Sequence, residues 1–154
     1  MDVPVAIPTP LTSIDELVPG ARYALGRFAL PRDEVVAFAE RFDPQPFHLS
    51  DAGGEASIFG ALIVPGLHTL AATFGRLVAS PLLRDISLGG TAMEIRWTAP
   101  LRPDEEIAVE VEVVEVTPSR ARRDRGTARL RYVASRVADG VMVMDAVGTF
   151  ILRR

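Results

Sequence analysis

The side chains best suited to acid–base chemistry in this chain are a carboxylate and an imidazole five residues apart, Asp43 and His48. Two prolines, Pro44 and Pro46, lie between them. Proline fixes its own φ and pushes the preceding residue towards an extended conformation. We therefore expect a stiff loop, with no helix continuing through it, that holds the acid and the base in a set relation. Such a pair can act together on one water molecule or one proton.

The backbone N–H of Gly66, eighteen residues after His48, is the third group of the predicted site. Gly66 stands at the expected start of an apolar helix, and a helix N-terminus offers unpaired N–H groups and positive dipole charge. Glycine also lets a ligand approach that backbone closely. An acid, a base and an oxyanion donor form a complete catalytic set. The alternatives are a glycine needed only for packing, a helix-terminating loop aspartate and a histidine satisfied by backbone groups.

This stretch resembles the motif of the MaoC-type dehydratases, also called (R)-specific enoyl-CoA hydratases, which have the hotdog fold. The motif of that family reads roughly Asp-x-Asn-Pro-(aliphatic)-His, followed by a glycine after an aliphatic pair. Asp43, Pro46 and His48 match it in place, and Gly66 matches it in spacing. The resemblance extends from about residue 17 to the C-terminus.

Three residues of the stretch depart from the family's pattern. Gln45 stands where the family usually has Asn, and Phe47 replaces a smaller aliphatic residue. Pro65 stands where a histidine often precedes the glycine. We expect the amide of Gln45 to orient the loop, and the apolar run 58–64 to border an acyl pocket. The predicted substrate-binding residues are Gln45, Phe47, Ile63, Val64 and Pro65.

The resemblance implies that the protein adds water to a trans-2-enoyl thioester, giving a (3R)-hydroxyacyl thioester, or runs the reverse dehydration. Asp43 and His48 would activate the water, and the N–H of Gly66 would stabilise the enolate. No metal ion and no redox cofactor is expected, and the thioester carrier would be coenzyme A or acyl carrier protein. The resemblance also implies an acyl-CoA-type substrate and a homodimer or higher homo-oligomer.

Two other functions remain open. A hotdog acyl-CoA thioesterase would hydrolyse the thioester, although such enzymes usually use a carboxylate without the Asp-x4-His loop. A non-catalytic acyl-thioester binding subunit is the second alternative, and the departures at Gln45 and Pro65 keep it open.

The composition excludes several other classes of protein. The chain has 154 residues, 48% of them hydrophobic, which is typical of one globular domain. Its net charge of −3 argues against a general nucleic-acid binder, and the absence of cysteine excludes disulfides and thiolate chemistry. Two histidines are too few for a histidine-rich metal site. The first ten residues lack the basic and apolar regions of a signal peptide, and proline and glycine interrupt the uncharged run 56–75. We expect a soluble, cytoplasmic protein with no membrane segment.

All seventeen basic residues are arginine, and four of them form a cluster: Arg120, Arg122, Arg123 and Arg125. Arginine forks bind phosphate, which coenzyme A carries. The alternative is a solvated hairpin loop that contains Asp124. His68, two residues after Gly66, is expected to be a core or interface histidine.

The periodicity of apolar residues predicts an α+β fold with one strand, two helices and then four strands. A strand is expected within 17–30, a helix over 31–42, one short helical turn within 49–57, and a buried apolar helix over 65–79. The remaining strands are expected over 93–98, 107–116, 127–136 and 141–152, the last being central. Residues 1–16 are predicted to form an extended arm and residues 17–154 a single domain. The resemblance makes that domain a hotdog domain, a largely antiparallel curved sheet wrapped around the long apolar helix.

Overall fold

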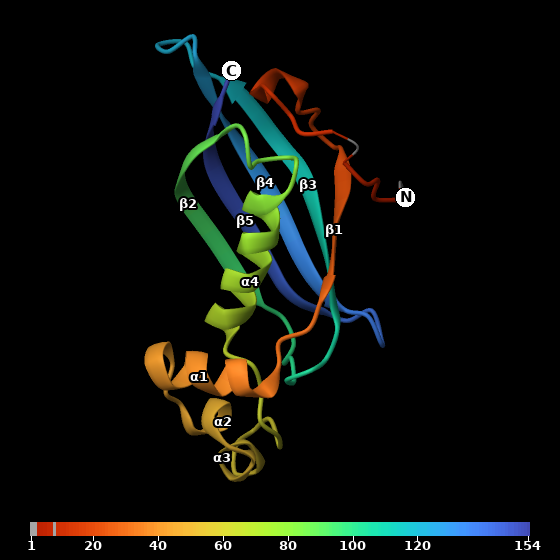
Figure 1. Cartoon of the computed structure of the whole chain (residues 1–154), viewed down its shortest axis with the longest axis vertical. Coiled ribbons are helices and arrows are strands. Elements are labelled where there is room, and N and C mark those ends of the chain that lie inside the picture. Colours follow the sequence, from red (N-terminus) through yellow and green to blue (C-terminus); the bar gives the residue numbers. More distant parts are fainter. Residues whose placement is uncertain (1–2, 8) are drawn as a thin grey trace.

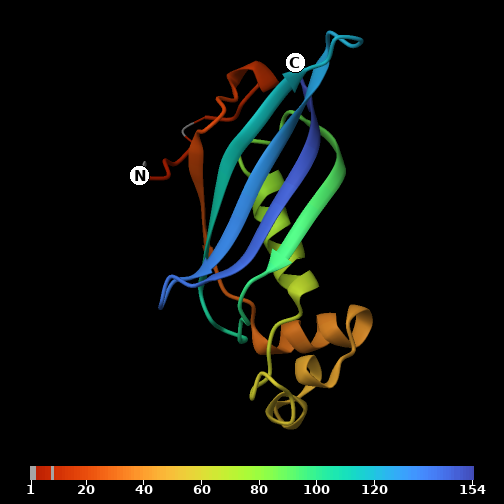
Figure 2. The same ribbon diagram turned by 180° about the vertical axis from the view of Figure 1, so that it is seen from behind.

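A computed structural model describes residues 3–7 and 9–154 of the chain (Figure 1). Five strands form one antiparallel sheet in the spatial order β1-β3-β4-β5-β2. The strands are β1 (Arg22–Phe28), β2 (Ser87–Trp97), β3 (Ile107–Pro118), β4 (Arg125–Arg136) and β5 (Met142–Arg153). Helix α4 (Gly66–Ala79) lies along one face of this sheet, and Figure 2 shows the opposite face from behind. The predicted sheet around a long helix is confirmed.

The two long helices begin and end where the local sequence predicts. Helix α1 (Arg32–Phe42) follows Pro31, carries two acidic residues in its first turn, and stops at Asp43. It cannot continue, because Pro44 disfavours helical dihedrals for the residue before it. Helix α4 follows Pro65 and ends at Ser80. Each helix therefore starts one residue later than expected, with a proline at its N-cap.

The core fills the space between α4 and the sheet. Leu77 of α4 and Leu130 and Tyr132 of β4 are fully buried there, and burial of this kind is the main favourable term in folding. Tyr132 reaches past the core to the edge of the sheet, where its hydroxyl donates a hydrogen bond to Sδ of Met93 at 3.3 Å. Burial raises the pKa of Tyr132 to about 12.

Two short helices stand where the sequence suggested mostly loop. Helix α2 (Pro46–Leu49) carries His48, so the predicted stiff loop is limited to residues 43–45, and no helix continues through it. Proline blocks a helix that runs into it but suits the first helical position, where its missing N–H is not needed. Helix α3 (Asp51–Glu55) is the short turn expected within 49–57, and the Ser50 hydroxyl accepts a hydrogen bond from the N–H of Gly53 at its start.

Strand β2 is longer and far more exposed than its alternating sequence suggests. It pairs only with β5 among the described residues and forms one edge of the sheet. Three of its large apolar residues stay half exposed, Leu88 by 45%, Met93 by 39% and Trp97 by 50%, whereas Ile95 packs against the core. Alternation shows that a strand has an apolar face, but tertiary structure decides whether anything covers it. Strand β5 is an interior strand, as predicted.

The N-terminal arm is not extended throughout. Val5 forms an isolated parallel bridge with Tyr23, whereas Ile14–Glu16 form a turn of 3-10 helix with a capping box. Ile14 is fully buried, so this turn contributes to the core. None of the described helices combines the length and the apolar character that crossing a membrane requires.

Candidate active site

The predicted acid and base come together at the end of the molecule where α1, α2 and α3 gather beyond the sheet (Figure 1). Asp43 caps the C-terminus of α1, and its own N–H still bonds the carbonyl of Ala39 at 2.9 Å. His48 follows on α2. The chain turn between the two helices brings the two side chains face to face, with 3.4 Å between His48 Nε2 and Asp43 Oδ2. Both side chains are largely enclosed, with 4% of His48 and 16% of Asp43 exposed.

Hydrogen bonds on the outer side of each group set its orientation. His48 Nδ1 lies 2.8 Å from the carbonyl oxygen of Ile63. A carbonyl only accepts, so Nδ1 carries a hydrogen, and in the neutral ring the lone pair of Nε2 faces the carboxylate. Gln45 Nε2 donates to Asp43 Oδ1 at 2.7 Å and leaves Oδ2 for the histidine side. The amide of Gln45 thus holds one oxygen of the Asp43 carboxylate in place.

When His48 is neutral and Asp43 is ionised, neither of the two facing atoms carries a hydrogen, so no hydrogen bond joins them directly. Nε2 of His48 and Oδ2 of Asp43 are both acceptors in that state, and they face each other across 3.4 Å. One water molecule beside them can donate one O–H to each acceptor. Such a water is oriented and polarised for attack, which is the arrangement that acid–base catalysis requires.

Gly66 is the first residue of α4, and its N–H lies at the free N-terminal end of the helix. The N–H groups of His68 and Thr69, in the first turn of the helix, both donate to the carbonyl oxygen of Pro65. No acceptor within the described residues is recorded for the Gly66 N–H. A Cβ at this position would lie only 2.5 Å from Nε1 of Trp97, so glycine is required for the approach of the indole ring.

Asp43, His48 and Gly66 line one cavity of about 460 Å³. This volume is in the range of small-molecule sites. Four of the five predicted substrate-binding residues line the same cavity: Gln45, Phe47, Ile63 and Val64. Pro65 does not line it, although it is buried at the N-cap of α4, where its carbonyl receives two helical N–H groups. The walls are mainly apolar, which suits an acyl chain.

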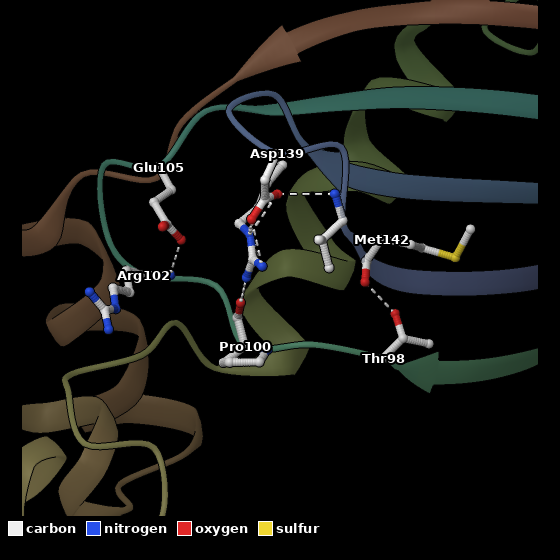
Figure 3. Close-up of polar contacts among 8 residues, drawn as sticks. Thr98, Pro100, Arg102, Glu105, Asp139 and Met142 are labelled. Atoms are coloured by element: carbon white, nitrogen blue, oxygen red, sulfur yellow. Dashed lines mark hydrogen bonds and ion pairs between the residues drawn. The ribbon is translucent and has the colours of Figure 1, made fainter.

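The far wall of the cavity comes from Trp97 and from residues 98–101. The sequence pattern predicts only the end of a strand here, at residue 98. Figure 3 shows how this segment is held against the turn between β4 and β5. Thr98 Oγ1 donates to the carbonyl of Met142 at 2.6 Å, and Arg136 donates to the carbonyl of Pro100 at 2.6 Å. These contacts join residues about forty positions apart, and no local pattern predicts them.

The remaining candidates lie outside the cavity. His68 is buried against α1, with its ring stacked on Phe38 at 4.5 Å and its Nε2 3.2 Å from Oε1 of Glu34. It is therefore a core histidine that joins α4 to α1. The arginine cluster at 120–125 lies in the β3–β4 turn, at the opposite end of the sheet from α1–α3 (Figure 1). Within this chain those arginines do not reach the cavity, and Arg125 is paired with Asp124.

Comparison with known proteins places the chain in a family. The model of the MaoC like domain matches residues 8–141, so the chain belongs to the MaoC-like family. A MaoC-like dehydratase from Rhodospirillum rubrum is 34% identical, with a TM-score of 0.83 over 91% of this chain and 95% of that one. The R-hydratase PhaJ1 from Pseudomonas aeruginosa shares the fold at 23% identity, with a TM-score of 0.71 over 92% and 85% of the two chains. The predicted α+β hotdog fold is confirmed.

A relative of unknown function also matches. The uncharacterized protein YdeM of Bacillus subtilis is 29% identical over 108 residues, which cover 70% of this chain and 77% of that protein.

Proposed function

We propose that the protein adds water to trans-2-enoyl thioesters to give (3R)-hydroxyacyl thioesters, or catalyses the reverse dehydration. The observation that carries this proposal is the convergence of Asp43, His48 and the N–H of Gly66 on one cavity. Family membership and the likeness to an R-hydratase support the same reaction class. The 3R outcome rests on that likeness alone.

The proposed reaction begins with a water molecule held between Asp43 Oδ2 and His48 Nε2. Asp43 takes a proton from the water as its oxygen bonds to C3 of the enoyl group, and His48 orients the water. The electron pair of the C2–C3 double bond moves towards the thioester, whose oxygen becomes an enolate oxygen. The N–H of Gly66 stabilises this charge, helped by the α4 dipole. The protonated acid then returns its proton to C2, which completes the addition of one water.

We further propose that coenzyme A or acyl carrier protein carries the acyl group and that the reaction takes place in the cytoplasm. No metal or redox cofactor takes part in the steps above. An apolar cavity beside Asp43 and His48 suits the acyl chain, while the polar carrier would remain in solvent. Comparing crotonyl-CoA with the same acyl group on acyl carrier protein would separate the two carriers by kcat/KM.

We also propose a homodimer or larger homo-oligomer. Edge strand β2 offers backbone groups that no described strand pairs on its outer side, together with the exposed apolar side chains of Leu88 and Met93. Exposed edges of this kind are usually covered in native proteins. Light scattering coupled to gel filtration would measure the mass, and a monomer at micromolar concentration would contradict the proposal.

The decisive experiment follows hydration of crotonyl-CoA by the loss of enoyl-thioester absorbance. Wild type, Asp43→Asn and His48→Ala would be compared with Asp33→Asn, a matched control with the same charge change on the exposed start of α1. We expect turnover by wild type and by the control, and a fall of roughly a hundredfold or more in the two dyad variants. Circular dichroism would establish that all four proteins are folded.

Each alternative has its own signature in the same assay. Release of free thiol in place of hydration would identify a thioesterase. Tight binding of acyl-CoA with no turnover, on short, long and branched enoyl groups and on carrier-protein substrates, would identify a binding subunit. Equal activity of Asp43→Asn and wild type would refute the mechanism even if hydration occurred.

A further inference from the structure

Trp97 occupies a place in the cavity that the reaction described above does not use. It is the last residue of β2 and the single tryptophan of the chain. It lines the cavity together with Asp43, His48 and Gly66, and half of it is exposed. An indole ring is both a flat apolar surface and an N–H donor.

The indole lies with its face on Gly66. A Cβ built on Gly66 would be 2.5 Å from Nε1, 2.6 Å from Cε2 and 2.9 Å from Cδ1 of Trp97. If the ring pointed its N–H edge at that position, the two carbons would be about 1 Å farther than the nitrogen, because they lie behind it. The near-equal distances indicate that the ring face covers Gly66. The indole N–H lies in the ring plane, so it does not point at Gly66.

The two N–H groups are close enough to share one acceptor. The Cβ position of a residue lies about 2.5 Å from its own backbone nitrogen. With Nε1 2.5 Å from that position, the two nitrogens are at most about 5 Å apart. Two donors that each lie about 2.9 Å from one oxygen can be separated by up to about 6 Å. The separation of the two nitrogens therefore allows one oxygen in the cavity to lie within hydrogen-bond distance of both.

The N–H of Trp97 has no protein acceptor among residues 3–7 and 9–154. The hydroxyl of its neighbour Thr98, which also lines the cavity, is already directed at the carbonyl of Met142. Half of Trp97 is exposed, so water can accept from this N–H before a substrate binds, and a carbonyl oxygen of a bound substrate would take the place of that water.

We propose that Trp97 is a second oxyanion donor, whose Nε1–H bonds the thioester carbonyl oxygen beside the N–H of Gly66. The inference rests on the proposed function, because it assigns a role in the same reaction. The bond strengthens as the oxygen gains charge in the enolate, so it lowers the barrier more than it tightens substrate binding. It also explains why residue 66 must lack a Cβ, since a side chain there would displace the donor.

Because the chain has one tryptophan, its indole can be replaced biosynthetically at a single position. β-(3-Benzothienyl)alanine keeps the bicyclic shape but has sulfur in place of N–H. We expect kcat for crotonyl-CoA hydration to fall roughly a hundredfold, with a much smaller change in KM. The matched control is 5-fluorotryptophan, which is incorporated in the same way, retains the N–H, and should leave kcat close to that of wild type. Trp97→Phe should show the same loss as benzothienylalanine. Full kcat in the benzothienyl protein would overturn the proposal.

A second readout does not depend on turnover. The single indole ¹H–¹⁵N signal of Asp43→Asn would be followed by NMR during titration with (3R)-hydroxybutyryl-CoA. We expect it to move downfield on saturation as the N–H bonds the carbonyl oxygen. Binding without such movement would refute the role of Trp97 and leave the proposed function intact. Binding with the movement, from a wild-type enzyme that hydrates no thioester, would refute the proposed function and retain the carbonyl contact. A protein that neither binds nor converts acyl-CoA would refute both.

Discussion

Replacing Gly66 with alanine should harm activity far more than stability. A new Cβ would meet three ring atoms of Trp97 at 2.5–2.9 Å, whereas heavy atoms in contact lie about 3.5 Å or more apart. The indole must therefore move by roughly 1 Å. A displacement of this size in catalytic geometry can cost about a hundredfold in rate, so we expect kcat for crotonyl-CoA hydration to fall by about that factor.

The stability cost is expected to be small because two effects oppose each other. Overpacking costs about 1–3 kcal/mol, and the half-exposed Trp97 can move, which favours the lower end. Alanine is also a better helix former than glycine by up to about 1 kcal/mol, and no left-handed φ at Gly66 prevents the substitution. The net loss should be under about 1 kcal/mol, or a fall in Tm of less than about 4 °C.

A double-mutant cycle isolates the clash. In a Trp97→Ala background the new Cβ has room, so Gly66→Ala should be neutral or should raise Tm. The coupling between the two sites should be about 1 kcal/mol in favour of the double variant. Thermal unfolding by circular dichroism, together with the crotonyl-CoA rate, measures both effects. An identical change in Tm in the two backgrounds, or full activity of Gly66→Ala in the presence of Trp97, would refute the contact.

Three further predictions concern the scaffold that holds the site. Leu77→Ala, at a fully buried position of α4, should cost about 3 kcal/mol in urea unfolding; a loss under about 1 kcal/mol would contradict the packing of α4 on the sheet. His68→Ala should cost about 2 kcal/mol because it removes the buried ring between α4 and α1. Glu34→Gln, at a side chain 58% exposed, should cost less than about 0.5 kcal/mol. Equal losses would show that the contact with Glu34, and not the stacked ring, joins the helices. A hydrogen-bonded Arg131 lowers the pKa of Asp145, so this pair should contribute up to about 1 kcal/mol at pH 7, and Asp145→Asn should remove it. Because the pKa of Asp145 is lower in the folded than in the unfolded chain, that contribution should be present above the ordinary carboxyl pKa of 3.8 and be lost as the pH falls below it. A difference in unfolding free energy between Asp145→Asn and wild type that stays constant down to pH 2 would contradict the assignment.

Several features of the protein depend on neighbours in the chain and can be predicted from its sequence. Pro44 ends α1 at Asp43 because a proline restricts the residue before it. The apolar pattern correctly predicts the helix α4, but the prediction that this helix is buried is only partly right. Leu77 packs in the core, whereas Leu67 on another side of the helix stays 45% exposed. The alternation in residues 107–113 predicts a strand with one buried face, and β3 shows that pattern. The motif of Asp43, His48 and Gly66 was likewise visible, because its spacing resembles that of a known family.

Which distant residues share the site depends on how the strands pair in the folded chain. The sheet order β1-β3-β4-β5-β2 places β2 at an edge, and this is why its apolar face stays exposed although its sequence alternates like that of a half-buried strand. The same order carries Trp97 to the N-terminus of α4, thirty-one residues from Gly66 along the chain. It also moves the arginine cluster to the opposite end of the sheet (Figure 1). Periodicity and turn chemistry act over a few residues, whereas these placements depend on how whole strands pair.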